Sequence, residues 1–243
     1  PHGLLGVSIA TTFQPEMARA VARRSKPDFI RSASLGIRMT ALLTIPAGVG
    51  IFVLRRPLIG LTLEYRNFTA DDALQTSRAL AGLALGLGAF SIYLFVLRTF
   101  YAHQDTKTAF KVNVVENAIN IILAVALVGA YGVLGLGLSY AIAYAISALW
   151  VLQILTYKVP GFELRSVLAS LGRMVVAAAL MGEAVWFVAR SVGANTGPGA
   201  ALRLGVGVAV GIAVYGGVLA AVRAPELDAL RQRLPGRSVA ADD

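Results

Sequence analysis

The sequence has no cysteine, only two histidines and few charged residues. The lack of cysteine excludes disulfides and thiolate metal sites, and His2 and His103 do not have the spacing of a metal-ligand pair. The chain also lacks a serine-nucleophile motif, a phosphate-binding loop and a zinc motif. We therefore expect a protein that is not an enzyme, with no catalytic residue, no cofactor and no metal site.

Charge is scarce, whereas apolar residues are abundant. Charged residues make up 14% of the 243 residues and hydrophobic residues 57%, and the mean hydropathy is +0.70. A soluble fold of this length cannot hide so much apolar surface, but a lipid bilayer accepts it. The net charge of +9 lies mostly between the apolar runs. That placement favours a bilayer as the partner and argues against nucleic acid.

The apolar residues form long runs without the alternation of an outer-membrane strand. Crossing the hydrocarbon takes roughly 20 apolar residues in a helix, and six runs reach that length. The sequence therefore predicts an all-α integral membrane protein, a polytopic bundle of six full transmembrane helices. The expected spans are Leu35–Leu54, Leu74–Ala102, Phe110–Gly129, Val133–Tyr157, Val167–Ala189 and Leu202–Val222.

The segments outside these spans are shorter or more polar. The run Pro1–Phe13 is too short to span, and because the chain begins with proline we expect a truncated helix of a longer protein. A polar basic stretch, Pro15–Arg31, follows it, and Pro57–Leu63 is predicted as a separate interfacial piece. Pro46 is expected to kink the first full span.

The distribution of Lys and Arg predicts the orientation. If all six spans cross in alternation, fifteen Lys and Arg fall on the side that holds Pro15–Ser34 and six on the other. Such a bias places the richer side, and with it the C-terminal tail, in the cytoplasm. Arg38 lies near a helix end, and it is the only basic residue that we expect to approach the interior of the bundle.

The third span carries a polar stripe formed by Asn113, Glu116, Asn117 and Asn120, which fall within an arc of roughly 100°. Such a stripe faces a hydrated cavity, or it makes hydrogen bonds that hold the bundle together. A carboxylate in mid-helix needs water, a cation or a proton, so Glu116 favours the first interpretation.

Other polar and small residues have structural explanations. Glu183, alone in the fifth span, is a candidate for the lipid interface. Asp71–Asp72 has the form of a prenyltransferase diphosphate site but lacks a second acidic cluster, so we expect one of the two to cap the second span. The pairs Gly82/Gly86 and Gly207/Gly211 indicate close helix packing.

Three stretches resemble one family in the order in which that family carries them. They are the opening Pro1–Thr11, the segment Pro57–Asp72 with its Leu-Glu-Tyr-Arg-Asn-Phe core, and the segment Leu97–Thr108 with Arg-Thr-Phe-Tyr-Ala and Asp-Thr-Lys-Thr. All three are similar to motifs of the MurJ/MviN family of lipid II flippases, in the multidrug/oligosaccharidyl-lipid/polysaccharide exporter superfamily. The chain departs from the family pattern at Tyr65, Asn67 and His103-Gln104.

The resemblance implies fourteen helices, arranged as two six-helix lobes with two extra helices. This chain then runs from inside the eighth helix to the fourteenth. Residues 1–13 belong to the truncated helix, 35–157 to the remainder of the second lobe, 167–222 to the two extra helices and 223–243 to a cytoplasmic tail.

The resemblance also implies a function, which is flipping of a polyprenyl-diphosphate-linked peptidoglycan precursor across the bacterial inner membrane by alternating access. A cationic cavity between the lobes holds the headgroup, and a groove formed partly by the last two helices takes the polyprenyl tail. The missing N-terminal lobe is then an obligatory partner, and cytosolic cell-wall proteins are candidate partners of the tail. The sequence does not specify a coupling ion.

Three alternatives stay open at this point. They are a related exporter of other lipid-linked oligosaccharides or drugs, a membrane scaffold for cell-wall machinery, and a membrane-embedded prenyl transferase. For a transporter, the candidate substrate or cavity residues are Arg38, Asn113, Glu116, Asn117 and Asn120, and the candidate lipid-groove residue is Glu183.

Overall fold

A computed structural model describes residues 7–63 and 69–222, and within these ranges it consists of helices joined by short turns. Six of the seven helices are long and apolar enough to cross a membrane. The predicted all-α membrane bundle is thereby confirmed. The helices are α1 (Val7–Ala22), α2 (Lys26–Thr62), α3 (Ala70–Ala102), α4 (Thr106–Tyr131), α5 (Val133–Lys158), α6 (Leu164–Ser191) and α7 (Gly197–Ala221).

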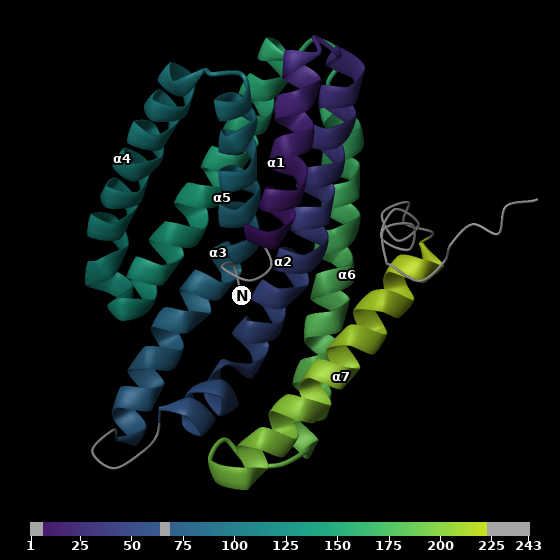
Figure 1. The fold of residues 1–243 in the computed structure, drawn as a ribbon. Coiled ribbons are helices and arrows are strands. Elements are labelled where there is room, and N and C mark those ends of the chain that lie inside the picture. Colours follow the sequence, from purple (N-terminus) through teal and green to yellow (C-terminus); the bar gives the residue numbers. More distant parts are fainter. Residues whose placement is uncertain (1–6, 64–68, 223–243) are drawn as a thin grey trace, which may run out of the picture.

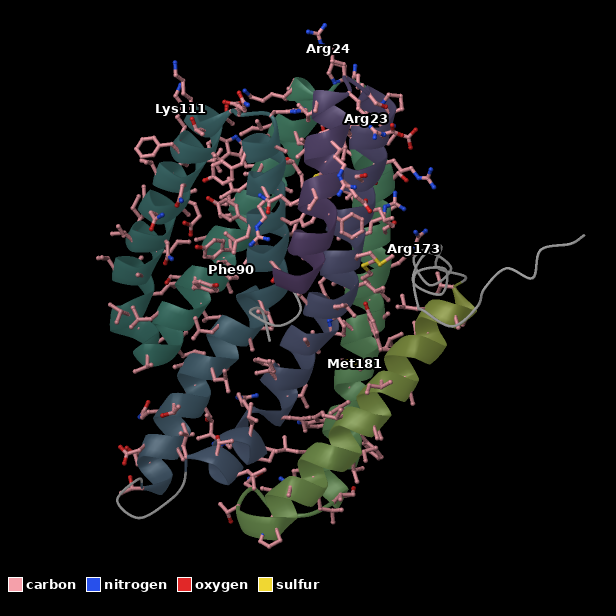
Figure 2. All side chains as sticks on the ribbon, viewed as in Figure 1. Arg23, Arg24, Phe90, Lys111, Arg173 and Met181 are labelled. Atoms are coloured by element: carbon pink, nitrogen blue, oxygen red, sulfur yellow. The ribbon has the colours of Figure 1, made fainter. Side chains whose placement is uncertain are left out.

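Helices α2, α3 and α5 form the centre of the bundle, because α3 packs extensively against both neighbours. Helix α4 leans on α5, α1 covers α2 and α3, and α6 and α7 pack on each other and on α2 (Figure 1). Successive helices run in opposite directions, so the turns that precede α2, α4 and α6 meet at one end of the bundle (Figure 1). We call this end the basic end, since Arg23, Arg24 and Lys111 project from it (Figure 2).

Glycine permits the closest contact in the centre. A Cβ atom added to Gly82 of α3 would lie 2.3 Å from the carbonyl carbon of Gly137 of α5, so the two backbones touch there. Gly86 packs in the same way against Tyr140 and Ala141 one turn deeper. The packing role predicted for the Gly82/Gly86 pair is confirmed.

Local capping explains where α3 and α4 begin. Thr69 is the N-cap of α3 and forms a capping box with Asp72, whose carboxylate accepts a hydrogen bond from the Thr69 backbone N–H at 2.9 Å. The expectation that Asp71 or Asp72 is itself the cap was wrong, although Asp72 takes part in it. Asp105 is the N-cap of α4, and its side chain accepts from the Thr108 N–H at 3.1 Å.

The structure corrects two boundaries. The basic stretch Pro15–Arg31 is helical except at the turn of residues 23–25, because α1 continues through Pro15 and α2 begins at Lys26. Phe13, Met17 and Ala20 form a buried stripe with helical spacing, and this packing outweighs the polarity of the intervening residues.

The second boundary concerns the predicted interfacial piece Pro57–Leu63. It is not separate, because α2 continues without a break through Arg55, Arg56 and Pro57 to Thr62. Pro57, Ile59 and Gly60 are buried, so protein contacts extend the helix. The kink predicted at Pro46 stays a prediction.

Candidate functional site

An apolar groove runs between α2, α6 and α7 and has a volume of about 530 Å³. Gly207, Gly211 and Gly216 of α7 line it, and none of the residues around it is charged. At the end of the groove nearer the basic end, the Tyr215 hydroxyl donates to the backbone oxygen of Leu42 at 3.1 Å, which fixes α7 against α2. The remaining residues that line the groove include Leu43, Pro46, Ala47, Gly50, Ile51, Leu54, Leu58, Met181, Val185, Leu204, Val208, Ile212 and Leu219.

Arg203 joins α6 and α7 at the end away from the basic end. Its guanidinium donates to the backbone oxygens of Val192 and Gly193 at 2.8 and 2.7 Å and to Asn195 Oδ1 at 2.6 Å. Gly193 has φ +65°, a conformation that favours glycine. The two helices are therefore held together at this turn and diverge toward the basic end (Figure 1).

Glu183 lies on α6 but is exposed, and it is not among the residues that line the apolar groove. Its neighbours in sequence, Met181 and Val185, supply the α6 wall. A role for Glu183 at the lipid interface stays a prediction.

A second cavity, of about 1070 Å³, opens at the basic end between α1, α2 and the turn that joins α5 to α6. We call it the cationic recess, because five basic side chains line it against three acidic ones. The basic residues are Arg19, Arg23, Lys26, Arg31 and Arg38, and the acidic residues are Glu16, Asp28 and Glu163. Arg38 is the deepest of the cations along α2, and its Nη2 donates to Ser166 Oγ at 2.8 Å.

Arg38 is half-buried, whereas the other four cations of the recess are exposed, so the expectation that Arg38 approaches the interior stays a prediction. Helical folding of the basic stretch brings Arg19 and Arg23 of α1 to the same recess as Arg31 and Arg38 of α2. The spacings of four and seven residues within these pairs are helical and are visible in the sequence. Arg173 is also deeper than a loop residue, since it lies in the third turn of α6 and faces away from α3, α4 and α5 (Figure 2).

The polar stripe of α4 divides between two environments. Glu116 is 1% exposed, and Asn120 is half-buried, with its Oδ1 accepting from Ser139 Oγ of α5 at 3.3 Å. Asn113 and Asn117 are exposed and hydrogen-bond each other, Asn117 Nδ2 donating to Asn113 Oδ1 at 2.8 Å. The structure thus brings Glu116 and Asn120 together and keeps the other two on the outer side of α4.

Aromatic residues of α3 and α5 surround Glu116. The side chains of Tyr144 and Glu116 interact electrostatically, and Tyr144 packs edge-on against Tyr93 and Phe90, with ring centroids 5.2 and 4.9 Å apart. Among the described residues, no hydrogen-bond partner reaches Oε1 of Glu116. Sequence reasoning found the acid but missed this tyrosine cluster, whose members lie on two other helices.

The basic end also carries an ion pair. Lys158, at the end of α5, contacts the carboxylate of Asp105 at 2.5 Å. Hydrogen bonds from Lys158 and Thr108 lower the pKa of Asp105 to about 2. The His103 ring stacks on Phe29 with centroids 4.2 Å apart, and burial lowers its pKa. These contacts tie the start of α4 to α5 and the end of α3 to α2.

Some predicted features lie outside the described residues. They are the family-like positions Tyr65 and Asn67, the first residues of the opening motif and the tail 223–243. In the part of the chain that the structure describes, no three His, Asp or Glu side chains gather where they could hold a metal ion.

The sequence and the fold both match known proteins. A family model described as "Lipid II flippase MurJ" matches residues 1–207. The "Probable lipid II flippase MurJ" of Vibrio cholerae serotype O1 is 32% identical over 78% of this chain and 33% of its own length. The "Lipid II flippase MurJ" of Thermosipho africanus is 31% identical over 67% of this chain and 33% of its own length.

A solved structure titled "Lipid II flippase MurJ, inward closed conformation" has the same fold. It superposes with a TM-score of 0.75 at 24% identity, covering 94% of this chain and 45% of that one. The chain spans about a third of the length of the curated relatives that it matches.

Proposed function

The chain belongs to the lipid II flippase MurJ family, and from that premise we propose that it forms the C-terminal part of a transporter that flips a lipid-linked peptidoglycan precursor across the bacterial inner membrane. The observation that carries the proposal is the family match over residues 1–207. In this proposal α1 to α5 belong to the second lobe, and α6 and α7 are the two additional helices.

The apolar groove is the proposed site of the polyprenyl tail. A long hydrocarbon chain needs an elongated apolar surface, and the groove is uncharged along three helices. Its glycines leave room that larger side chains would fill. The groove lies on helices that cross the membrane, so a lipid tail reaches it without entering water.

The basic end is the proposed cytoplasmic end. Of the Lys and Arg that the structure describes, eleven lie at this end and five toward the other, with Arg38 in α2 between them. The positive-inside rule supports a cytoplasmic location for the end that is richer in these residues. An Ala22→Cys variant of the full-length protein is expected to resist an impermeant thiol reagent in intact cells and to react after lysis. Labelling in intact cells refutes this orientation.

This chain on its own is not expected to flip lipid. Alternating access moves one repeat unit against another around a site between them, and residues 1–243 supply only one of the two lobes. The chain should still insert, since each span satisfies its own backbone hydrogen bonds.

The test is reconstitution of the full-length protein and of residues 1–243 in liposomes with labelled lipid-linked precursor. We expect the full-length protein to flip the precursor and residues 1–243 not to flip it. A fragment as fast as the full-length protein would place the whole transport site within this chain, and the polar stripe of α4 would be its first candidate. A full-length protein that moves no precursor contradicts the proposed function.

A further inference from the structure

The cationic recess and the apolar groove follow one another along α2. The recess reaches as deep as Arg38, and the groove begins at Leu42. Four residues of α-helix separate these positions by about 6 Å along the axis and about 40° around it. A cationic cavity therefore lies one helical turn above an uncharged one, on neighbouring faces of the same helix.

The wall of the recess is held in place by apolar anchors. Val159 and Phe162 of the α5–α6 turn are buried, and Gly161 between them has φ +97°. A Cβ atom at Gly161 would lie 3.5 Å from Ile30, so the turn rests directly on α2. The hydrogen bond from Arg38 to Ser166 joins α2 to the first turn of α6. The recess is therefore built by α1, α2 and a fixed turn, which the Arg38–Ser166 hydrogen bond ties to α6.

The chemistry of the recess suits a ligand with several negative charges. Four of its five cations are arginines, whose planar guanidinium groups bind phosphate oxygens in pairs. The three carboxylates that share the recess leave an excess of two positive charges. A volume of about 1070 Å³ exceeds what a single phosphate needs and leaves room for sugar groups attached to it.

We propose that the cationic recess binds the diphosphate of a prenyl-linked lipid whose hydrocarbon chain lies in the apolar groove, with α2 carrying both parts. The recess is then a docking site within this lobe, separate from any cavity between the two lobes. This inference rests on the proposed function, which supplies the lipid class. It assigns a role to Arg19, Arg23, Arg31 and Arg38 together.

Binding of a long-chain polyprenyl diphosphate to the full-length protein in nanodiscs tests the proposal. The double variant Arg19→Gln/Arg31→Gln changes two exposed side chains and is expected to fold normally. Loss of two charge-assisted contacts should weaken binding about tenfold. The matched control is Arg165→Gln, since Arg165 is exposed at the same end but does not line the recess.

The partner variant Glu163→Gln removes one acidic group from the recess and should strengthen binding severalfold, with smaller effects of both variants at high salt. Inorganic diphosphate should bind far more weakly than the prenyl diphosphate, because it makes no use of the groove. Unchanged prenyl diphosphate affinity in the double variant overturns the proposal, as does equal displacement by phosphatidylglycerol.

A flipping assay on the same preparations distinguishes a failure of the proposed function from a failure of the proposed binding site. If the wild-type protein flips the precursor and the double variant binds prenyl diphosphate with unchanged affinity, only the proposed role of the cationic recess is refuted. Wild-type protein that binds prenyl diphosphate but moves no precursor contradicts the proposed function, while the loss of affinity in the double variant still supports the recess.

Discussion

The α3–α5 interface and the α7 interface both use glycine, with opposite results. Gly82 and Gly137 bring two backbones into direct contact in the centre of the bundle. On α7, Gly211 lies in ordinary contact distance of Val185 and Met181, and Gly216 has no neighbour within 4 Å of an added Cβ. Without a hydrophobic force between helices in lipid, close packing stabilises the first interface. At the second interface Gly207 is tightly packed, since an added Cβ atom would lie 2.9 Å from the Leu54 side chain, but Gly211 and Gly216 leave a cavity.

The strongest test of this contrast is Gly82→Leu. The new side chain has no space, because even a Cβ atom would lie 2.3 Å from backbone of α5 that cannot move aside cheaply. We expect a loss of about 3 kcal/mol or more in the free energy of unfolding. Thermal unfolding of the full-length protein in detergent measures the effect. Gly129→Leu is the control, since Gly129 is exposed with open space around it, and an equal loss there contradicts the distinction.

The variant Gly211→Phe tests the second interface, where the glycines of α7 line the apolar groove. Gly211 is buried at the groove, so a phenyl ring fills the space proposed for the hydrocarbon tail. Flipping and polyprenyl binding should fall by about tenfold or more, whereas the unfolding temperature should change little. Gly217→Phe places the same ring on the exposed face of α7 and should leave transport intact. If both variants transport normally, the groove does not hold the tail.

Helix α4 lies outside both interfaces, and Glu116 is its buried acid. Glu116→Leu should impair transport more than folding, because leucine fills the site but supplies no polar group. Glu116→Gln, which keeps a polar group beside Tyr144, is expected to retain more activity. Transport rates and melting temperatures of both variants, beside Glu183→Leu at an exposed acid, provide the comparison. A structure of the full-length protein with Glu116 among acyl chains contradicts this role.

The smallest expected effect concerns Asp105, in the turn between α3 and α4. Asp105→Asn removes the ion pair with Lys158 but keeps an oxygen that caps α4, which should cost about 1 kcal/mol or less. The pKa of Asp105 in the folded protein, about 2, lies below its ordinary value of 3.8. Its contribution is therefore present above pH 4 and lost as the pH falls toward 2. The melting temperatures of wild type and variant should converge over that interval, and a constant difference contradicts the assignment.

The sequence predicted the six spans because each is a continuous apolar run. The helix ends and the cationic recess were harder to predict from the sequence, because they depend on contacts between helices. The buried stripe of Phe13, Met17 and Ala20 was available in the sequence, but the intervening basic residues obscured it. The position of Glu116 on its helix was predictable, whereas its tyrosine neighbours come from α3 and α5 and required the packing of three helices.

Helix α2 has 37 residues and is therefore about 55 Å long, while the hydrocarbon core of a bilayer is about 30 Å thick. Arg31 near one end and Arg55 near the other are separated by about 36 Å of helix, a little more than the thickness of that core. In a thinner bilayer, α2 must tilt to keep the apolar residues between these two arginines within the hydrocarbon. Because α2 lines both cavities, a change in its tilt moves one wall of the cationic recess and one wall of the apolar groove together.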